Sequence, residues 1–182
     1  MSFVCPFVPC VRAGLRVTGT SVQLDLSLHV LGQGAYGRVL RAEHRETGEH
    51  VALKLSHAAA DQSVLVEVAA FQRCGNHPSV IGFQGYWLVG GFHCIALELA
   101  TGGELFTLVE HRLPLQEELG VLIFKELLCG VAYLHSVGVA HRDLKLENAM
   151  VSSQGILKVV DFGFACLHQP KEGGGFESRQ MR

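Results

Sequence analysis

The sequence predicts an α+β fold, in which a five-stranded antiparallel sheet with one main helix (residues 25–100) precedes a partial, mostly helical part (residues 101–165). Two observations support this division. In the first part, short apolar or alternating runs are separated by glycine-rich turns, as is typical of strands that follow one another in a meander. After Thr101, Gly102 and Gly103, the apolar residues recur at spacings of three and four, which indicates helices.

Local patterns predict each strand of the sheet. The stretch VQLDLSLHV alternates apolar and polar residues and predicts a strand over residues 22–30. A glycine-rich turn then leads to the run RVLRAEH, and a second turn leads to the run HVALKLS. Residues 80–89 and 92–99 lie on either side of Gly90 and Gly91, which is a hairpin signal. These five segments account for the predicted sheet.

Three helices are expected, and two of them have a clear apolar face. The first begins at Asp61 and ends near the sequence GNHP. Its apolar face is formed by Val64, Leu65, Val68 and Phe71. A short helix is expected over residues 104–110 and a long amphipathic helix over residues 116–136. The apolar stripe of the long helix comprises Leu119, Leu122, Ile123, Leu127, Val131 and Leu134. Two short strands are then expected around the sequence HRDLKLEN.

The composition is that of a folded protein without a strong charge bias. The chain has 182 residues, of which 48% are hydrophobic, and its formal net charge is −2. A sizeable core is therefore feasible, and neither nucleic acid nor a membrane surface is expected as a partner. The six cysteines form no C-x-x-C pair, which is typical of reduced thiols in a cytosolic protein. We therefore expect a cytoplasmic location.

Both ends of the chain have weak structural signals. Residues 1–24 predict an irregular leader, because their apolar start has no basic residues before it and contains Pro6 and Pro9. A signal peptide is the alternative. The apolar start is too short to span a bilayer, and no other apolar run of membrane length is evident. Residues 166–182 include three consecutive glycines and predict a loose tail.

The glycine-rich turn GQGAYGRV is the first candidate for binding chemistry. Its glycines stand where a backbone could approach a phosphate without interference from Cβ atoms. A dinucleotide-binding turn has a similar spacing, but that motif requires a helix next, whereas a strand-like run follows here. A plain glycine-rich hairpin remains the structural alternative for this motif taken alone.

Charged and oxygen-bearing side chains supply the other candidates. Lys54 stands among apolar residues in the middle of a predicted strand and needs a charged partner, which Glu67 on the next helix could supply. Asp143, Asn148 and Asp161 lie on predicted loops and carry the oxygen ligands that Mg²⁺ prefers, with substrate phosphates completing its coordination. Each of these residues would be unremarkable alone.

Their order along the chain is specific. A glycine loop, a strand lysine, a helix glutamate, HRDLKLEN and DFG follow one another, and from about Leu28 to Ala165 the sequence resembles a eukaryotic protein kinase domain. The resemblance implies an ATP-dependent enzyme with Mg²⁺ as cofactor and a protein as substrate. It implies that Lys54 holds the α- and β-phosphates and is oriented by Glu67. Asp143 would accept the proton of the substrate hydroxyl, and Lys145 would steady the γ-phosphate.

The resemblance also implies where the nucleotide and metal bind. Asn148 and Asp161 would hold Mg²⁺. The residues implied around ATP, besides Lys54, are Leu31, Gly32, Gln33, Gly34, Ala35, Tyr36, Gly37, Val39, Ala52, Leu97, Glu98, Ala100 and Met150. Among them, Val39 and Ala52 would cover the adenine ring, Met150 would lie below it, and Glu98 to Ala100 would bond its edge. An internal hydrophobic stack is implied for Phe71, Phe83, His141 and Phe162.

The resemblance implies a substrate class as well. Lys145 follows Asp143 by two residues, as in serine/threonine kinases, whereas tyrosine kinases typically carry an arginine-containing variant of this loop. The strings LATGGELF and DLKLEN resemble the calmodulin-dependent and AMP-activated group. The sequence gives no indication of the oligomeric state.

The chain departs from the kinase pattern after DFG. No A-P-E motif follows Gly163, and Ser178 is the one serine or threonine after that glycine. We therefore expect a domain that is truncated after DFG, whose long helix keeps an uncovered apolar face and whose carboxy-terminal half is marginally stable and prone to aggregation. Two functional hypotheses follow: an active serine/threonine kinase, or a non-catalytic fragment that binds nucleotide or a protein partner.

Overall fold

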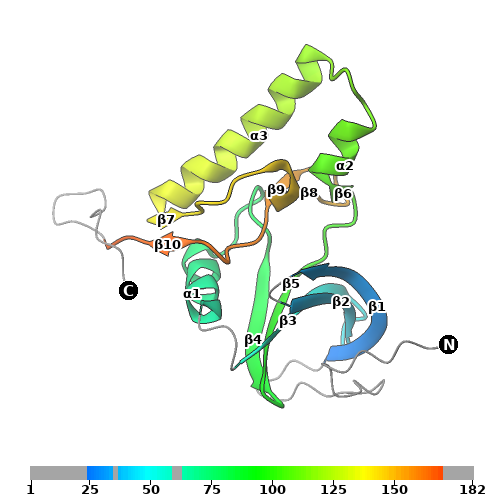
Figure 1. Ribbon diagram of the computed structural model, residues 1–182, viewed down its shortest axis with the longest axis vertical. Helices are drawn as coiled ribbons and strands as arrows, with labels where there is room; N and C mark the ends of the chain where they lie inside the picture. The colour runs from blue at the N-terminus through cyan, green and yellow to red at the C-terminus, as the bar shows by residue number, and fades with distance from the viewer. Residues whose placement is uncertain (1–23, 35–36, 59–62, 170–182) are drawn as a thin grey trace.

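The computed structural model describes residues 24–34, 37–58 and 63–169, and places a strongly curved sheet beside a smaller helical part (Figure 1). The sheet comprises β1 (Leu24–Gly34), β2 (Gly37–His44), β3 (His50–His57), β4 (Phe83–Val89) and β5 (Phe92–Glu98). Its strands lie in the order β1-β2-β3-β5-β4, and every neighbouring pair is antiparallel. The predicted five-stranded antiparallel sheet is confirmed.

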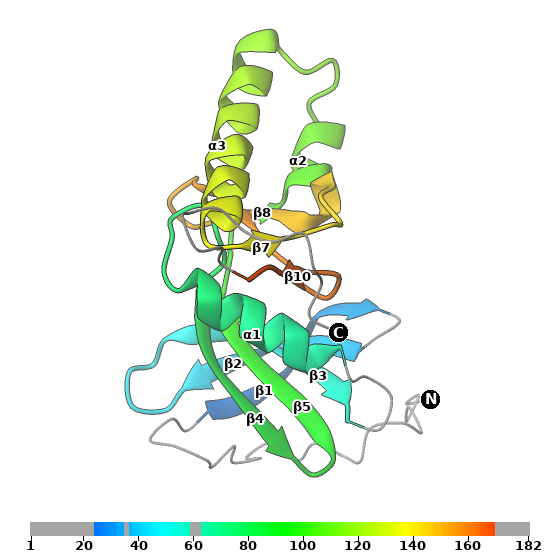
Figure 2. The ribbon, with the colours of Figure 1, turned by 90° about the vertical axis from the view of Figure 1, so that its left-hand side faces the viewer.

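The helix α1 (Val64–Cys74) crosses one face of this sheet, in front of β4 and β5 in Figure 2. Its buried residues include Val64, Val68 and Phe71, three of the four predicted for its apolar face. Leu65 is instead 57% exposed, because it lies on the opposite side of the helix. The helix ends at Gly75, whose φ of 55° is favourable for glycine and confirms the predicted stop. The predicted start at Asp61 lies outside the described residues.

The second part contains the predicted helices α2 (Leu105–Glu110) and α3 (Glu117–Ser136), together with small sheets. The short strands are β6 (Gly103–Glu104), β7 (Val139–Ala140), β8 (Ala149–Val151), β9 (Leu157–Val159) and β10 (Cys166–Leu167). They form a three-stranded sheet in the order β6-β8-β9 and a two-stranded sheet of β10 and β7. The short 3-10 helix η1 (Leu146–Asn148) lies between β7 and β8.

The prediction of a loose tail from residue 166 is wrong for its first residues. Cys166 and Leu167 pair with Ala140 and Val139 and are buried. The guanidinium of Arg73 on α1 donates a hydrogen bond of 2.7 Å to the backbone carbonyl of His168. These contacts depend on chain segments far apart in the sequence, so the composition of the tail could not reveal them. Residues 1–23 and 170–182 of the predicted leader and tail lie outside the described residues.

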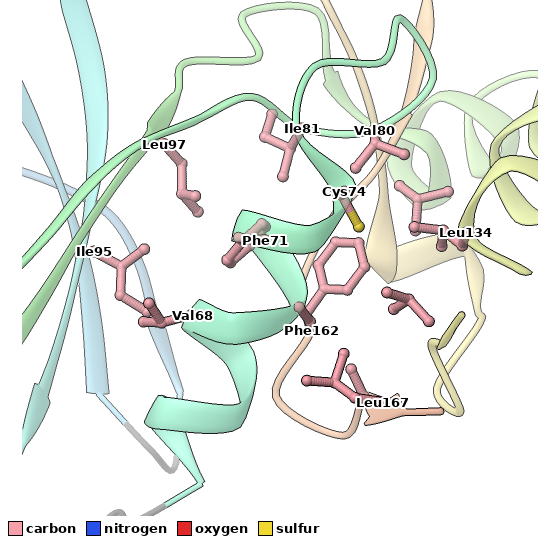
Figure 3. Close-up of a cluster of buried hydrophobic side chains, with 14 of the residues drawn as sticks. Val68, Phe71, Cys74, Val80, Ile81, Ile95, Leu97, Leu134, Phe162 and Leu167 are labelled. Atoms are coloured by element: carbon pink, nitrogen blue, oxygen red, sulfur yellow. The ribbon is translucent and has the colours of Figure 1, made fainter. Parts of the chain in front are cut away.

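One hydrophobic core joins the two parts, as Figure 3 shows around Phe71 and Phe162. The ring of Phe71 stacks on Phe83 at a centroid distance of 5.7 Å and contacts Phe162 at 4.8 Å. Phe162 in turn contacts the imidazole of His141 at 5.0 Å. The four residues of the predicted stack therefore form one continuous row from β4 through α1 to the sequences HRDLKLEN and DFG.

The outer face of α3 is not covered by any other described part of the chain. On this face Val121 (43%), Phe124 (59%) and Leu128 (49%) are exposed. Leu122 is also exposed (60%), but it lies one turn before Glu126 on the other side of the helix. The opposite side of the helix buries Leu134 and Gly130, and Glu126 accepts a 2.7 Å hydrogen bond from the backbone of Leu157. By length and composition alone α3 could cross a bilayer. These inward contacts instead identify it as a helix of the folded domain.

The exposed face of α3 predicts aggregation that one substitution should reduce. Phe124→Glu is expected to slow concentration-dependent aggregation, because it divides the apolar patch without removing a buried contact. The free energy of unfolding should change by less than about 0.5 kcal/mol, as for other surface substitutions. Static light scattering at increasing protein concentration measures the effect. The control Lys125→Gln changes the net charge equally but keeps the ring, so an equal benefit from it would contradict the prediction.

Candidate active site

Lys54 joins three segments that are distant in the sequence. From the middle of β3, its ammonium donates a hydrogen bond of 2.7 Å to Oε1 of Glu67 on α1 and one of 2.9 Å to Oδ1 of Asp161, which follows β9. The contact with Glu67, whose side chain is 3% exposed, confirms the partner predicted for this lysine. The contact with Asp161 was not predicted. It brings the sheet, the helix and DFG to one point.

The electrostatics of this cluster favour the charged forms of Lys54 and Asp161. Burial lowers the pKa of Lys54, but the attraction of Glu67 and then Asp161 outweighs burial, so its pKa is raised overall. Burial raises the pKa of Asp161, and the Lys54 ammonium outweighs it, so this pKa is lowered overall. At neutral pH the Lys54 ammonium therefore lies within hydrogen-bond distance of the ionised carboxylate of Asp161 and of the carboxyl group of Glu67.

The loop after β7 arranges Asp143, Lys145 and Asn148. The ammonium of Lys145 lies 2.9 Å from Oδ2 of Asp143. The side-chain amide of Asn148, which is buried, donates 2.8 Å hydrogen bonds to the backbone oxygen and to Oδ2 of Asp143. The hydrogen bond from Lys145 is the largest cause that lowers the pKa of Asp143. The carboxylate is therefore fixed from two sides and remains ionised at neutral pH.

Backbone geometry holds this loop close to DFG. The His141 ring accepts a hydrogen bond at Nδ1 from the Asp143 backbone (3.3 Å), so its Nε2 donates to the carbonyl of Val160 (2.9 Å). Arg142 and Asp161 have positive φ angles of 66° and 60°, a conformation that costs free energy for residues other than glycine. Arg142 compensates with a 2.7 Å hydrogen bond from its Nε to the carbonyl of Phe164.

The glycine-rich turn forms the hairpin between β1 and β2, where Gly34 pairs with Gly37. A Cβ atom at Gly37 would lie 2.0 Å from the carbonyl oxygen of Leu55, so no other residue fits there. Apart from their chain neighbours, no described residue has an atom within 4 Å of a Cβ built on Gly32 or Gly34, and Leu31 is 41% exposed. Gln33 is also exposed. Ala35 and Tyr36, at the tip, lie outside the described residues.

The residues predicted around adenine lie in two groups. Ala52 pairs with Leu97 across β3 and β5, and both border the core that also includes Ala100 and, partly buried, Met150. Val39 is half-buried and pairs with Lys54 across β2 and β3. Ala52, Leu97 and Ala100 therefore share one core cluster with Met150, which comes from β8 in the second part.

One charged pair near this region was not predicted. The ammonium of Lys158 on β9 lies 2.9 Å from Oε2 of Glu98, at the end of β5. Lys158 is 9% exposed, although it is a lysine. Like Lys54, Lys158 stands among apolar residues, in LKVV. Its need for a charged partner could therefore have been predicted in the same way.

The side-chain oxygens of Asn148 and Asp161 are of the type that a divalent metal site uses when substrate phosphates complete the coordination. Since Nδ2 of Asn148 is directed at Asp143, its carbonyl oxygen Oδ1 faces away from Asp143 and can serve as a ligand. Asp161 adds a carboxylate. No group of three or more His, Cys, Asp and Glu side chains in the described part of the chain could hold a metal ion. A divalent cation bound here would therefore depend on the phosphates of a substrate for much of its coordination.

Comparisons with known proteins agree with this arrangement. The family model described as protein kinase domain matches residues 26–180. CBL-interacting serine/threonine-protein kinase 26 of Arabidopsis thaliana is 41% identical over 152 residues, which cover 80% of this chain and 34% of that protein. Serine/threonine-protein kinase grp of Drosophila melanogaster is 39% identical over 145 residues, which cover 78% of this chain and 28% of that protein.

A third relative, CBL-interacting protein kinase 17 of Oryza sativa subsp. japonica, is 37% identical over 146 residues, 76% of this chain and 32% of its own. The chain thus spans about a third or less of the length of these relatives. The family model, however, covers most of the chain, and it includes the glycine turn, Lys54, Glu67, HRDLKLEN and DFG that the structure assembles. The chain belongs to the protein kinase family.

Proposed function

We propose that this protein is an ATP-dependent serine/threonine kinase, which transfers the γ-phosphate of ATP to a hydroxyl group of a protein. The contact of the Lys54 ammonium with both Glu67 and Asp161 supports the proposal most strongly. It places a fixed positive charge beside a carboxylate suited to a metal ion, as binding of a metal–triphosphate complex requires.

The nucleotide would lie between the glycine-rich turn and the second part of the molecule. Open space around Gly32 and Gly34 leaves the backbone of the turn able to approach phosphates. Lys54 would bond the α- and β-phosphates, while Glu67 holds its ammonium in place. Val39 and Ala52 would cover the adenine from one side and Met150 from the other, with Leu97 at the back.

Phosphate transfer would depend on position and charge more than on reactive groups. Asp143, held by Asn148, is ionised and can orient the substrate hydroxyl and accept its proton. Lys145, 2.9 Å from Asp143, can follow the γ-phosphate during transfer. We infer that Asn148 and Asp161 hold Mg²⁺, which neutralises the phosphate charge when it is bound.

Serine and threonine are the proposed acceptors. Lys145 takes the position, two residues after Asp143, that a lysine has in serine/threonine kinases. The names of the relatives are consistent with this choice, since those from Arabidopsis and Drosophila are serine/threonine-protein kinases. The sequence around the phosphorylated residue is not specified by these features.

Nucleotide-dependent thermal stability tests the proposal. ATP with Mg²⁺ is expected to raise the melting temperature of the protein, because a ligand that binds only the folded state stabilises it. At a ligand concentration 100 times its Kd, the stabilisation would be about 2.7 kcal/mol. Asp161→Ala should remove most of the Mg²⁺-dependent part of this shift, and transfer of labelled phosphate to a generic basic protein should be lost with it.

The outcomes distinguish the two functional hypotheses. Binding together with transfer supports the kinase, whereas binding without transfer supports a non-catalytic nucleotide-binding protein. If the melting temperature did not respond to ATP and Mg²⁺ at all, the nucleotide site itself would be wrongly assigned. Lys125→Gln, on the exposed face of α3, is a matched control, because it removes a charge far from the site and should change neither readout.

A further inference from the structure

The ion pair Glu98–Lys158, in which Lys158 is buried and Glu98 is partly exposed, connects the two parts of the molecule. Glu98 ends β5, and Lys158 is the middle residue of β9. Their charged atoms lie 2.9 Å apart, and the side chain of Lys158 is 11% exposed. A buried lysine is costly unless it is paired, so this contact is a defined feature of the fold. The proposed catalytic mechanism does not use it.

Glu98 also holds the segment between α1 and β4. Its Oε2 accepts a 3.1 Å hydrogen bond from the backbone of Gly82, and its own backbone N–H donates a 2.8 Å bond to the carbonyl of Gly82. One residue earlier, the backbone of Ile81 donates to the carbonyl of Val159, and Val159 donates to the carbonyl of Ser79. Residues 79–82 are therefore bonded to both β5 and β9.

Three functional elements meet at this junction. The segment 79–82 follows α1, which carries Glu67. Lys158 lies on β9, and Asp161 follows three residues later, just after the end of this strand. Glu98 itself begins the backbone that would bond the edge of adenine. A shift of β9 relative to β5 would thus change the position of Asp161 relative to the backbone of residues 98–100. The ion pair between Glu98 and Lys158 opposes such a shift.

We propose that Glu98 and Lys158 are positioning residues for nucleotide binding: their ion pair fixes the backbone of residues 98–100 against β9, so that adenine and phosphates can be bound together. This inference rests on the proposed function for its ligand. It assigns a role to the side chain of Glu98 that is separate from the role of its backbone, and a role to Lys158 where the sequence had indicated none.

A double variant separates positioning from stability. Glu98→Gln alone would leave Lys158 buried without a negative partner and could unfold the protein. Glu98→Gln combined with Lys158→Met removes both charges, while the glutamine oxygen can still accept from Gly82 and the methionine keeps an apolar stem. The control Glu118→Gln with Lys125→Met makes the same chemical changes on exposed residues of α3.

Two measurements on the full chain are needed. Titration calorimetry with ADP and Mg²⁺ should give a Kd about threefold to tenfold higher in the Glu98→Gln/Lys158→Met double variant, the effect expected when one hydrogen bond is no longer well positioned. Hydrogen exchange in the absence of nucleotide should become faster at the amides of Ile81, Gly82 and Glu98. The control double variant should match the wild type in both measurements.

The outcomes of these two measurements separate a failure of the positioning role from a failure of the proposed kinase function. If hydrogen exchange and ADP affinity were both unchanged in the Glu98→Gln/Lys158→Met double variant, the inference would be overturned, even if the melting temperature fell. The pair would then be purely structural. Failure of the wild type to bind ADP with Mg²⁺ would overturn the proposed function instead. In that case the exchange rates alone would decide whether the pair fixes the backbone.

Discussion

Lys54→Met is expected to reduce phosphate transfer by about 10²–10³-fold, the loss typical when one preorganised charge donor is removed from an active site. Methionine has nearly the length of lysine but no ammonium, so the fold can be kept while the contacts with Glu67 and Asp161 disappear. Phosphate transfer to a basic protein, measured beside ATP binding, tests this result. Transfer at the wild-type rate would show that Lys54 does not hold the phosphates.

The same substitution should also lower stability. Glu67 is 2% exposed and loses an ammonium 2.7 Å from its carboxylate. Loss of a charged hydrogen-bond partner in a buried setting costs about 1.5–3 kcal/mol. Urea unfolding measures this change.

The double variant Lys54→Met with Glu67→Gln separates the two effects. Neutralising the carboxylate should restore part of the stability but none of the transfer. If transfer returned with stability, the loss in the single variant would reflect folding and not phosphate binding.

Much of the first part could be predicted because its signals are local. Alternation and glycine turns specify the five strands, and the glycine at residue 75 ends α1 where the sequence indicates. The pairing of Lys54 with Glu67 could also be predicted, since a lysine among apolar residues needs a partner and a glutamate on the next helix was the nearest candidate.

The features that were missed depend on contacts between distant segments. The strand β10 has two residues and exists through its pairing with β7, which no local pattern indicates. The second partner of Lys54 lies 107 residues away. The roles of Ala35 and Tyr36, which lie outside the described residues, stay predictions, as do the metal roles of Asn148 and Asp161.

The exposed face of α3 illustrates a limit of periodicity. The predicted stripe included Leu122, which is 60% exposed, whereas Leu134 of the same stripe is completely buried. The other five stripe residues are half-buried or buried, and Val121, Phe124 and Leu128, which lie outside the stripe, are exposed. Spacing therefore predicted the inward side of the helix, but it could not predict how far along the helix that side is covered, because α3 packs on β7 and β9 only through tertiary contacts.

Phe71→Ala is expected to be the most destabilising single substitution in the core, with a loss of about 3–5 kcal/mol in the free energy of unfolding. The ring is 1% exposed and packs between Phe83 and Phe162. Its removal leaves a cavity at the point where α1, β4 and DFG meet, and rigid elements on three sides limit collapse into it. Chemical denaturation of the wild type and the variant measures the loss.

This substitution should affect nucleotide binding as well, although Phe71 lies away from the proposed phosphate site. The row from Phe83 to His141 includes Phe71 on α1, the helix that carries Glu67, and Phe162, the residue after Asp161, so we infer that it helps to position both partners of Lys54. A cavity in that row loosens α1 relative to DFG, so ADP affinity should fall in the fraction that remains folded. Phe106→Ala, at a ring that is 41% exposed on α2, should change stability by less than about 0.5 kcal/mol and leave affinity unchanged. If Phe71→Ala lowered stability but not affinity, the row would hold the core together without positioning the site.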